Sequence, residues 1–427
     1  MKLSLKIVSV VVLVALLGLW LVNVLLINAI PTPKRLTQGL EVNYSVESGE
    51  FQRSLQAFSQ FGITTGNSIQ QLTDGEEIYA AKLAAIDAAE YSVTFEVYEF
   101  YGEEAAKPMA EAFANAAQRG VAVHVLLDHV GSMDADREWL DSMEDAGVNL
   151  HRYHYPSWYN LTNLNYRTHR KILVTDGRYG FMGGANIGDD WLEGDNGHGF
   201  RDHHFRMEGP IVASIQAIFA DNWLNATGVL LAGDRYYPEL EEAGEYTLQA
   251  IKSSPSQGHH RIRAMLLYAL ATVESQFTAS TAYFYPDDVF LEAMMQALER
   301  GVQVRILLSG SEMDKGYVRN AGVNRWREAL AAGLQIYKYD LAMYHSKIIV
   351  ADDHWATFGS ANLDNRSFRI NDEANILVWS PELAVQMREI VEADIENATL
   401  YTLDDWHERT WYRRVYGRLA SVFGAHY

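Results

Sequence analysis

Two copies of one residue pattern carry the clearest chemical meaning in this sequence. Both read H-x-K-x4-D-x6-G-[GS]-x-N, once in each half of a chain of 427 residues. A neutral imidazole can attack an electrophile and a protonated one can give a proton to a leaving oxygen, so two histidines supply a nucleophile and a general acid. The members are His169, Lys171, Asp176, Gly183, Gly184 and Asn186 in the first copy, and His345, Lys347, Asp352, Gly359, Ser360 and Asn362 in the second.

A phosphodiester is the substrate class that these side chains fit. Negative charge spreads over its non-bridging oxygens at the transition state, where cations and amide donors already in place stabilise it. Lys171 and Lys347 supply the cations, and Asn186 and Asn362 supply the amide donors. The pattern predicts a phosphodiester site and leaves open the carbon skeleton attached to the phosphorus.

Each motif histidine is expected at the start of a buried strand. Residues 172–175 and 348–351 are apolar and rich in β-branched side chains, which is typical of such strands. Alternation would then place the histidine and lysine on one face. Asp176 and Asp352, at the far ends of these strands, are expected to be structural and to pair with neighbouring groups.

The duplication extends beyond the motifs. Residues 119–128 and 300–309 share an R-G-V start and an apolar continuation, and each follows a predicted strand and helix that begin at 91 and 277. Strands that alternate with helices in this way indicate α/β units. The sequence therefore predicts two similar α/β halves.

The doubled pattern resembles the signature of the phospholipase D superfamily. This resemblance implies two α/β halves packed face to face, with the active site at their interface. Members of the family form a covalent phosphohistidine on one histidine and protonate the leaving alcohol with the other, without a metal. By position, His169 would be the nucleophile and His345 the acid and later base, with the reverse order as the alternative. The phosphate-binding residues implied in this way are Lys171, Asn186, Lys347 and Asn362.

The same resemblance implies a carboxylate after each motif, which orients the motif's histidine by accepting a ring N–H. Asp202 and Glu373 are the candidates, and Asp195 is a rival for Asp202 because a Gly- and Asp-rich insertion lies just before it. We therefore expect Asp202 to orient His169 and Glu373 to orient His345.

Composition excludes several classes of site and partner. The chain has no cysteine, so disulfides and thiolate metal sites are ruled out. Its net charge of −20 argues against a nucleic-acid partner, since binding to phosphate backbones depends on lysine and arginine. The histidine pairs at 203–204 and 259–260 lack an accompanying acidic pair, so we predict no metal and no cofactor.

Both ends of the chain carry features typical of membrane contact. Residues 7–27 contain no charge and are long enough to span a bilayer, which predicts a single-pass anchor in a bacterial-type cell membrane, with a cleaved secretory signal as the alternative. The C-terminal residues fit either an amphipathic interfacial helix or a terminal helix packed on the core. The predicted organisation is a transmembrane helix at 1–30, a tether and lead-in at 31–67, a first phospholipase D-like half at 68–250, a second at 251–400, and the C-terminal helix at 401–427.

The stretches at 116–128, 205–212, 283–286 and 359–373 are similar to those of bacterial cardiolipin synthases, a group within the superfamily that the chain resembles over roughly residues 68 to 400. The resemblance implies a transfer that makes cardiolipin and glycerol from two phosphatidylglycerols through a phosphatidyl-histidine, with phosphatidylethanolamine as a second candidate substrate. The alternatives are a hydrolase of the phospholipase D type, a phosphodiesterase or nuclease, and a non-catalytic lipid-binding protein. Candidate contacts for the acyl or glycerol part of the substrate are Tyr98, Tyr101, Tyr283 and Tyr285.

Overall fold

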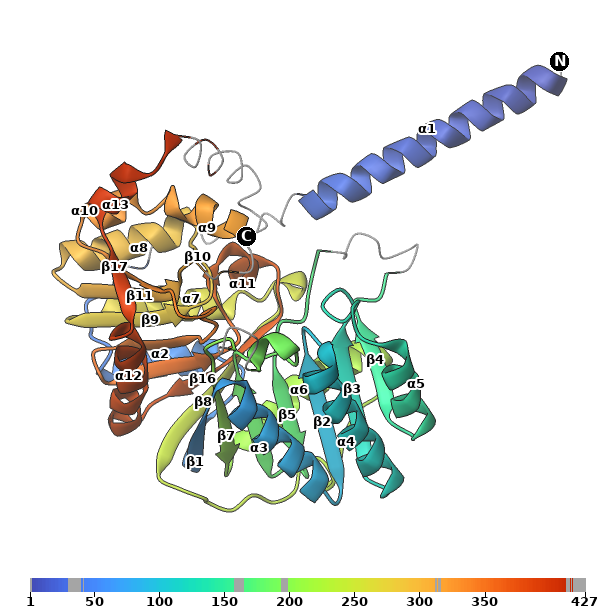
Figure 1. Ribbon diagram of the computed structural model, residues 1–427, viewed down its shortest axis with the longest axis horizontal. Coiled ribbons are helices and arrows are strands. Elements are labelled where there is room, and N and C mark those ends of the chain that lie inside the picture. The colour runs from blue at the N-terminus through green and yellow to red at the C-terminus, as the bar shows by residue number, and fades with distance from the viewer. Residues whose placement is uncertain are drawn as a thin grey trace.

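The computed structural model describes residues 2–29, 40, 42–156, 165–192, 199–311, 313, 316–411, 415 and 417. Two α/β halves form its body, and one long N-terminal helix projects from it (Figure 1).

The N-terminal helix and the first half account for the elements up to residue 227. They are α1 (Lys2–Ala29), α2 (Gly49–Phe58), β1 (Ile63–Thr73), α3 (Asp74–Ala88), β2 (Ser92–Val97), the π-helix η1 (Gly102–Ala106), α4 (Lys107–Gln118), β3 (Ala122–Asp128), α5 (Arg137–Asp145), β4 (Asn149–Tyr153), β5 (Ile172–Thr175), β6 (Tyr179–Gly183), η3 (Asp189–Trp191), β7 (His203–Glu208) and α6 (Ile211–Thr227).

The second half supplies the remaining elements. They are β8 (Tyr246–Ser253), η4 (Pro255–Gln257), α7 (Arg261–Thr272), β9 (Gln276–Thr281), β10 (Phe284–Tyr285), α8 (Asp288–Glu299), β11 (Gln303–Ser309), α9 (Gly316–Val323), α10 (Arg327–Ala331), β12 (Gln335–Tyr339), β13 (Ile348–Ala351), β14 (Trp355–Gly359), β15 (Leu363–Asp364), α11 (Asn365–Arg369), β16 (Glu373–Val378), α12 (Pro381–Ile395), β17 (Ala398–Tyr401) and α13 (Leu403–Glu408).

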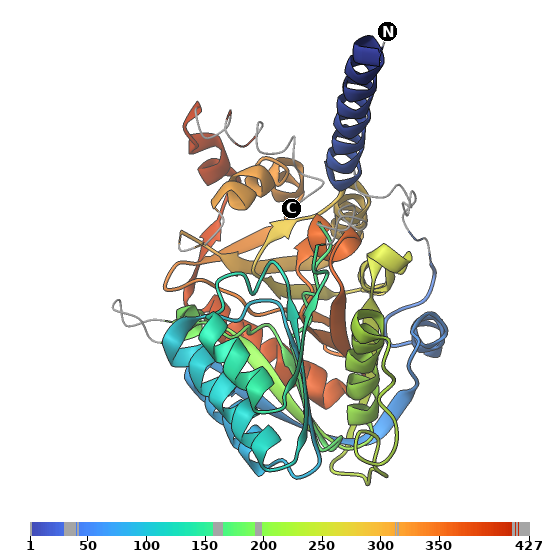
Figure 2. The ribbon, with the colours of Figure 1, turned by 90° about the vertical axis from the view of Figure 1, so that its right-hand side faces the viewer.

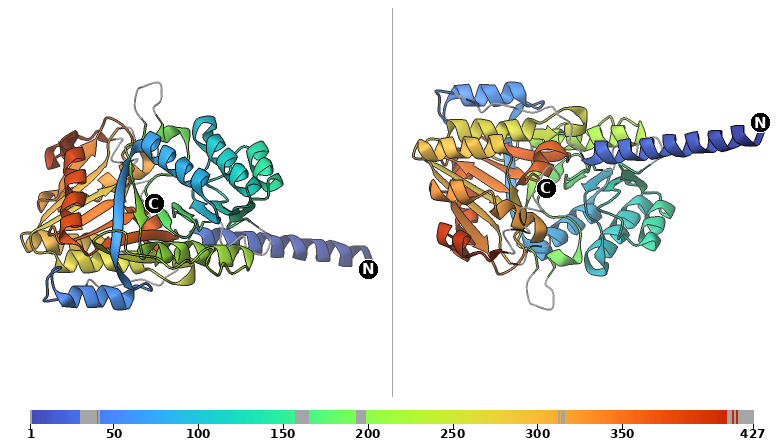
Figure 3. Two further views of the ribbon diagram at one scale, coloured as in Figure 1. Left: turned by 90° about the horizontal axis from the view of Figure 1, so that it is seen from below. Right: turned by 90° about the horizontal axis from the view of Figure 1, so that it is seen from above.

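Both halves repeat one strand order. The first runs β1-β7-β6-β5-β2-β3-β4 and the second β8-β16-β14-β13-β9-β11-β12, with β17 beyond β12. Antiparallel pairing of β1 with β8 joins them into a 15-stranded sheet, and β1 lies between the halves in Figure 3. The prediction of two similar α/β halves is confirmed. The expected limits at 68 and 250 fall inside β1 and β8, so each half begins with one of these strands.

The two halves also pack face to face. One buried cluster combines residues of both halves, and at its centre the rings of Phe205 on β7 and Phe358 on β14 lie 4.1 Å apart. Helices α6 and α12 contribute to the same cluster. Separate apolar clusters attach α3, α4 and α5 to the outer side of the first half and α7 and α8 to the outer side of the second (Figure 2).

The repeated R-G-V stretch closes the end of a neighbouring helix in each half. The guanidinium of Arg119 donates to main-chain carbonyls at the end of α3, at 3.0 Å to two of them, and Arg300 donates to carbonyls at the end of α7, the shorter bond being 2.7 Å. Carbonyls in the last turn of a helix have no partner within the helix. The repeated arginine therefore supplies hydrogen-bond donors to the carbonyls at a helix end in both halves.

The motif aspartates support the fold at a distance from the histidines. Asp176 has a φ of 53° and accepts hydrogen bonds from the main-chain N–H groups of residues 90–92. Asp352 has a φ of 51° and accepts from residues 274–276. Each carboxylate therefore fixes the start of the adjacent strand, β2 or β9, as the structural interpretation requires.

The N-terminal helix differs from the prediction. Its described side chains cover residues 10–23 and 25, and the large apolar ones are exposed, such as Leu13 at 58% and Leu17 at 55%. A span needs about 20 consecutive apolar residues. Within the described part of the chain, no helix has the length and apolar character needed to cross a bilayer. The predicted transmembrane anchor is accordingly corrected.

Part of the predicted termini lies outside the described residues. This applies to residues 31–39 and 41 of the tether and to most of the C-terminal segment, where only residues 411, 415 and 417 are described after position 410. The prediction of an amphipathic helix at 401–427 therefore falls largely outside the described residues, which contain the short helix α13 at its start.

We predict that Gly120→Ala lowers the free energy of unfolding by about 1 to 2 kcal/mol, the cost of a left-handed conformation for a residue with a Cβ. Gly120 has a φ of 92°, and its repeat equivalent Gly301 has a φ of 90°. Urea unfolding monitored by circular dichroism measures the change. Gly62→Ala is the control, because its Cβ would also meet nothing within 4 Å and its φ is not in that region. Equal losses in both variants would contradict the conformational explanation.

Candidate active site

The two motif histidines lie at the seam between the halves. His169 and Lys171 immediately precede β5, and His345 and Lys347 immediately precede β13. The main-chain N–H of His169 donates to the carbonyl of Asp372 at 2.9 Å, and that of His345 donates to the carbonyl of Arg201 at 2.8 Å. Each motif is therefore bonded to the opposite half at its histidine.

Each histidine is oriented by the carboxylate of the other half. Nδ1 of His169 lies 2.9 Å from Oε1 of Glu373, and Nδ1 of His345 lies 2.9 Å from Oδ2 of Asp202. The predicted pairing within each half is therefore wrong, although all four residues meet at the seam. The reason is two parallel bridges: residue 168 stands opposite 372 and residue 344 opposite 201, so the following residues become neighbours.

Hydroxyl and amide donors surround the Glu373 carboxylate. It is fully buried and accepts from Ser360 Oγ, from Ser367 Oγ at 2.8 Å and from Asn371 Nδ2 at 3.4 Å. Burial raises the pKa of Glu373, and the positive charge of Lys171 and these donors oppose the rise. Ser360 occupies the position in the second motif that Gly184 occupies in the first.

Asp202 has a different set of partners in equally complete burial. The indole Nε1 of Trp191 donates to its Oδ2 at 3.0 Å, and the main-chain N–H of His203 donates to Oδ1 at 2.8 Å. Burial alone would raise the pKa of Asp202, but the hydrogen bond and charge interaction with His345 hold it below its ordinary range. A Cβ at Gly184 would lie 2.3 Å from Oδ1, which explains why the first motif cannot carry serine there.

Both motif lysines are buried beside their histidines. Nζ of Lys171 donates to the carbonyl of His169 at 2.7 Å, and Nζ of Lys347 donates to the carbonyl of His345 and lies 2.8 Å from its Nδ1. Burial lowers the pKa of Lys171 to about 7, against the opposing influence of Glu373. An anion bound here would favour the charged form of both lysines.

The motif asparagines are fixed by equivalent loops. The carboxamide oxygen of Asn186 accepts from the main-chain N–H of Glu99, and that of Asn362 accepts from the N–H of Ala282, both at 3.3 Å. The amide nitrogen of Asn186 donates to the Glu99 carboxylate at 2.6 Å. Sequence reasoning did not identify Glu99, which lies after β2 and outside both motifs.

The His345 imidazole is poised in its neutral form. Burial and the neighbouring Lys347 lower its pKa to about 4, and the bond to Asp202 opposes this effect. The ring is enclosed by Trp191, whose ring centroid lies 5.1 Å away in an edge-on arrangement. With Nδ1–H directed to the carboxylate, Nε2 is the nitrogen left for chemistry.

A buried aspartate outside both motifs connects the halves behind this site. Asp394 on α12 accepts from Tyr344 Oη at 3.0 Å, bonds Arg201 at 2.8 Å, and lies 3.0 Å from Nε2 of His203. Tyr344 and Arg201 flank His345 and Asp202 in sequence, so Asp394 supports their positions. No sequence signal identified it, because its partners are distant along the chain.

The predicted tyrosine contacts separate into different environments. The ring of Tyr98 lies 5.6 Å from the imidazole of His169 and 5.6 Å from Nζ of Lys171, so it borders the site. Tyr101 donates to Asp190 at 2.8 Å, and Tyr285 is buried with Arg325 5.4 Å from its ring.

No residue of the described chain belongs to a group of three or more histidine or acidic side chains suited to a metal. Asp195, the rival for Asp202, lies outside the described residues.

The comparisons with known proteins agree with this geometry. The family model described as cardiolipin synthase, PLD-like domain, matches residues 83–223 and 266–395, together more than half of the chain. The chain belongs to this phospholipase D family. One matched segment falls within each half, and the four residues of the seam, His169, Asp202, His345 and Glu373, lie in them.

Curated relatives and a solved structure extend this likeness. Cardiolipin synthase 2 of Bacillus anthracis is 32% identical over 349 residues, covering 81% of this chain and 68% of the relative. Cardiolipin synthase A of Pseudomonas entomophila is 33% identical, covering 83% and 74%. A phosphatidylserine synthase of Haemophilus influenzae has the same fold, with a TM-score of 0.70 at 14% identity over 90% of this chain and 97% of that one.

We predict that Lys347→Met moves the pKa of His345 from about 4 toward 6.5, because a positive charge next to the buried imidazole is removed. Titration of isotope-labelled histidine rings by nuclear magnetic resonance measures the shift. Lys338→Met is the matched control and should leave the His345 titration unchanged. In Glu373→Gln the ring signal of His169 should move instead. A shift of the His345 signal in that variant would contradict the pairing across the seam and support the pairing within each half.

Proposed function

We propose that the protein is a phosphatidyltransferase that makes cardiolipin and glycerol from two molecules of phosphatidylglycerol. The observation that carries this proposal is the pair of imidazoles at the seam, each with Nδ1 at 2.9 Å from a buried carboxylate. Two oriented histidines flanked by two lysines suit a two-step exchange at one phosphorus. The cardiolipin synthases to which the chain is similar supply the lipid identity.

In the first step, Nε2 of His169 attacks the phosphorus of the donor lipid. The bond from phosphorus to the glycerol headgroup oxygen breaks, and His345 gives its proton to that oxygen. The products are free glycerol and a phosphatidyl group bonded to His169. Glu373 holds the tautomer of His169 and stabilises the positive charge that its ring acquires.

In the second step, the neutral His345 accepts the proton of a hydroxyl on the headgroup of the second phosphatidylglycerol. The oxygen of that hydroxyl attacks phosphorus, the bond to His169 breaks, and cardiolipin is released. His345 is then protonated again, so each turnover returns both histidines to their starting forms. Water in place of the lipid alcohol would give phosphatidic acid, the product of a hydrolase.

The substrate itself supplies the conditions for protonating His345. In the free protein, burial and Lys347 keep the pKa of this imidazole at about 4, which favours the neutral form. A phosphodiester carries one negative charge, and its binding beside Lys171 and Lys347 opposes their field and raises the pKa of His345. General acid chemistry is thereby linked to substrate binding.

A lipid substrate also requires contact with a membrane, and α1 is the element that we assign to it. Three of its apolar side chains, Leu13, Leu17 and Leu21, are between 52% and 58% exposed, and the helix extends away from the catalytic body (Figure 1). Association through these side chains would keep the enzyme at the cell membrane, where phosphatidylglycerol and the second candidate, phosphatidylethanolamine, occur. The net charge of −20 remains unfavourable for a nucleic-acid substrate.

We predict a covalent intermediate on His169. Acid quench of the purified enzyme with phosphatidylglycerol, followed by peptide mass spectrometry, should find a phosphatidyl group on the peptide that contains His169. His169→Ala should lose the adduct together with both transfer and hydrolysis. An adduct on His345 would reverse the two roles. The absence of any adduct under rapid quench would favour direct displacement.

The same incubation tests the proposed reaction. Lipid mass spectrometry should detect cardiolipin, with free glycerol in equal amount, from phosphatidylglycerol alone. Phosphatidic acid without cardiolipin, even with acceptor lipid present, would contradict transfer and identify a hydrolase. Addition of phosphatidylethanolamine tests whether the second headgroup is also accepted.

We predict that Glu373→Gln and Asp202→Asn each lower turnover by roughly 10²- to 10⁴-fold, within the range for acid–base groups and their partners. Both substitutions keep side-chain size and remove the charge that stabilises an imidazolium. Because Glu373 serves the proposed nucleophile, its variant should slow adduct formation; Asp202→Asn should slow release of the headgroup and its replacement. Near-normal turnover in both folded variants would contradict the assignment of orienting carboxylates.

A further inference from the structure

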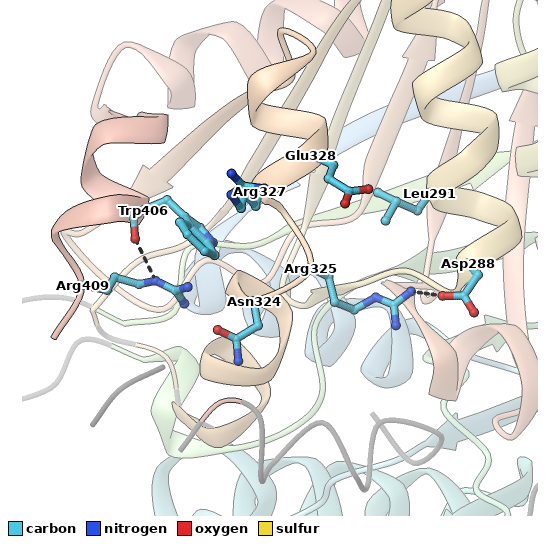
Figure 4. Close-up of a pocket in the computed structure, with 8 residues that line it drawn as sticks. All are labelled: Asp288, Leu291, Asn324, Arg325, Arg327, Glu328, Trp406 and Arg409. Atoms are coloured by element: carbon cyan, nitrogen blue, oxygen red, sulfur yellow. Dashed lines mark hydrogen bonds and ion pairs between the residues drawn. The ribbon is translucent and has the colours of Figure 1, made fainter. Parts of the chain in front are cut away.

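A polar pocket lies outside the catalytic seam, at the end of the second half that carries α8, α9, α10 and α13. It has a volume of about 480 Å³ and contains the side chains drawn in Figure 4. No histidine or lysine of the motifs lines it. Its charged lining residues are three arginines, Arg325, Arg327 and Arg409, and two carboxylates, Asp288 and Glu328, and the indole of Trp406 lies among them.

Three arginines converge on this pocket in a chain that has 35 basic and 55 acidic residues. The guanidinium of Arg327 lies 5.8 Å from the Trp406 ring and that of Arg409 lies 4.5 Å from it. The indole is fixed by a bond of 2.7 Å from its Nε1 to the carbonyl of Val323. Trp406 thus holds two guanidinium groups beside the opening, as Figure 4 shows.

The third arginine, Arg325, has a carboxylate partner that an incoming anion could replace. Arg325 is ion-paired with Asp288, whose side chain is 94% exposed. Exposed ion pairs contribute little stability, because solvent screens them. The guanidinium fork matches the oxygens of a phosphate better than a lysine would, since it can donate two parallel hydrogen bonds.

The pocket is connected to the catalytic seam by short elements of the second half. The guanidinium of Arg325 lies 5.4 Å from the ring of Tyr285 on β10. β10 pairs in parallel with β15, which directly follows the motif residue Asn362. An occupant would therefore be near the site that handles lipid without taking part in the reaction.

The surroundings of the pocket indicate a membrane interface. Beyond Arg409 the chain continues to Trp411, 75% exposed, and Val415, 45% exposed. Exposed tryptophan with arginine is typical of the headgroup level of a bilayer. Helix α1, with its exposed aliphatic side chains, extends from the same end of the molecule (Figure 1, Figure 2).

We infer that this pocket binds the phosphate group of an anionic phospholipid in the bilayer, as a headgroup site separate from the catalytic seam. The inference depends on the part of the proposed function that puts the enzyme at a lipid surface, but it does not depend on phosphatidyl transfer. A bound headgroup would hold the second half against the membrane while the seam exchanges its substrates.

Vesicle binding of the full chain tests this site. Co-sedimentation is measured with phosphatidylcholine vesicles that contain or lack phosphatidylglycerol, in the His169→Ala background so that no lipid is consumed. Arg327→Gln and Arg325→Gln should each reduce the phosphatidylglycerol-dependent binding by about 5-fold, the effect of one basic side chain near an anionic surface. Arg327→Lys should lose part of it, because an ammonium keeps the charge but cannot donate two parallel hydrogen bonds.

Arg178→Gln is the matched control, because it removes one exposed arginine from the β5–β6 turn, at the opposite end of β5 from His169. An equal loss in this control would mean a general charge effect and would overturn the site, as would unchanged binding in both pocket variants. Inorganic phosphate is also added to the vesicle-bound protein with an unchanged pocket. If it releases the protein more than chloride does at equal ionic strength, the site is reassigned to a soluble phosphate compound. Pocket-dependent binding that persists, while the enzyme with His169 intact makes no cardiolipin from phosphatidylglycerol, would refute the proposed function alone.

Discussion

The structure depends on two short main-chain bridges that cross the seam, one between residues 168 and 372 and the other between residues 344 and 201. They fix the register between the halves at the two points where histidines stand. Since the next residue in each bridged segment is a motif histidine or a carboxylate, the bridges place an imidazole against a carboxylate twice. A shift of either bridge by one residue would separate the imidazole and the carboxylate that follow it, because successive side chains of an extended chain point to opposite sides.

Burial makes this register essential for the charges at the seam. Two lysines and two carboxylates lie together at exposures of 3% or less, and in the free protein their formal charges cancel when both histidines are neutral. Removing one partner would leave a charge uncompensated in a poorly solvated site, which is a strongly destabilising condition. Addition of a phosphodiester anion disturbs this balance by one negative charge. A proton on an imidazole restores the balance, and in the proposed mechanism that proton is the one given to the leaving alcohol.

Much of the site could be predicted from the residue pattern alone. The motif positions, the buried strands after each His-x-Lys, the duplication and the structural role of Asp176 and Asp352 all follow from local sequence. The partner of each histidine could not be predicted, because offsets along the chain carry no information about which half supplies it. Glu99 and Asp394 were missed for a related reason: they act through contacts with residues far away in sequence. The uncharged, aliphatic run at residues 7–27 predicts a membrane span, but no helix in the described part of the chain has the length and apolar character for one.

The pairing of β1 with β8 also bears on whether one half could be stable by itself. β1 ends the strand order of the first half and β8 ends that of the second, so each covers an edge of hydrogen-bonding groups that the other half would otherwise expose. Open edges of this kind promote aggregation. A chain containing one half would need a second copy to cover its edge and to complete its histidine with a carboxylate. The duplicated chain is in this respect a symmetric dimer held in a single polypeptide, in which the two copies have become free to differ, as they do at Gly184 and Ser360.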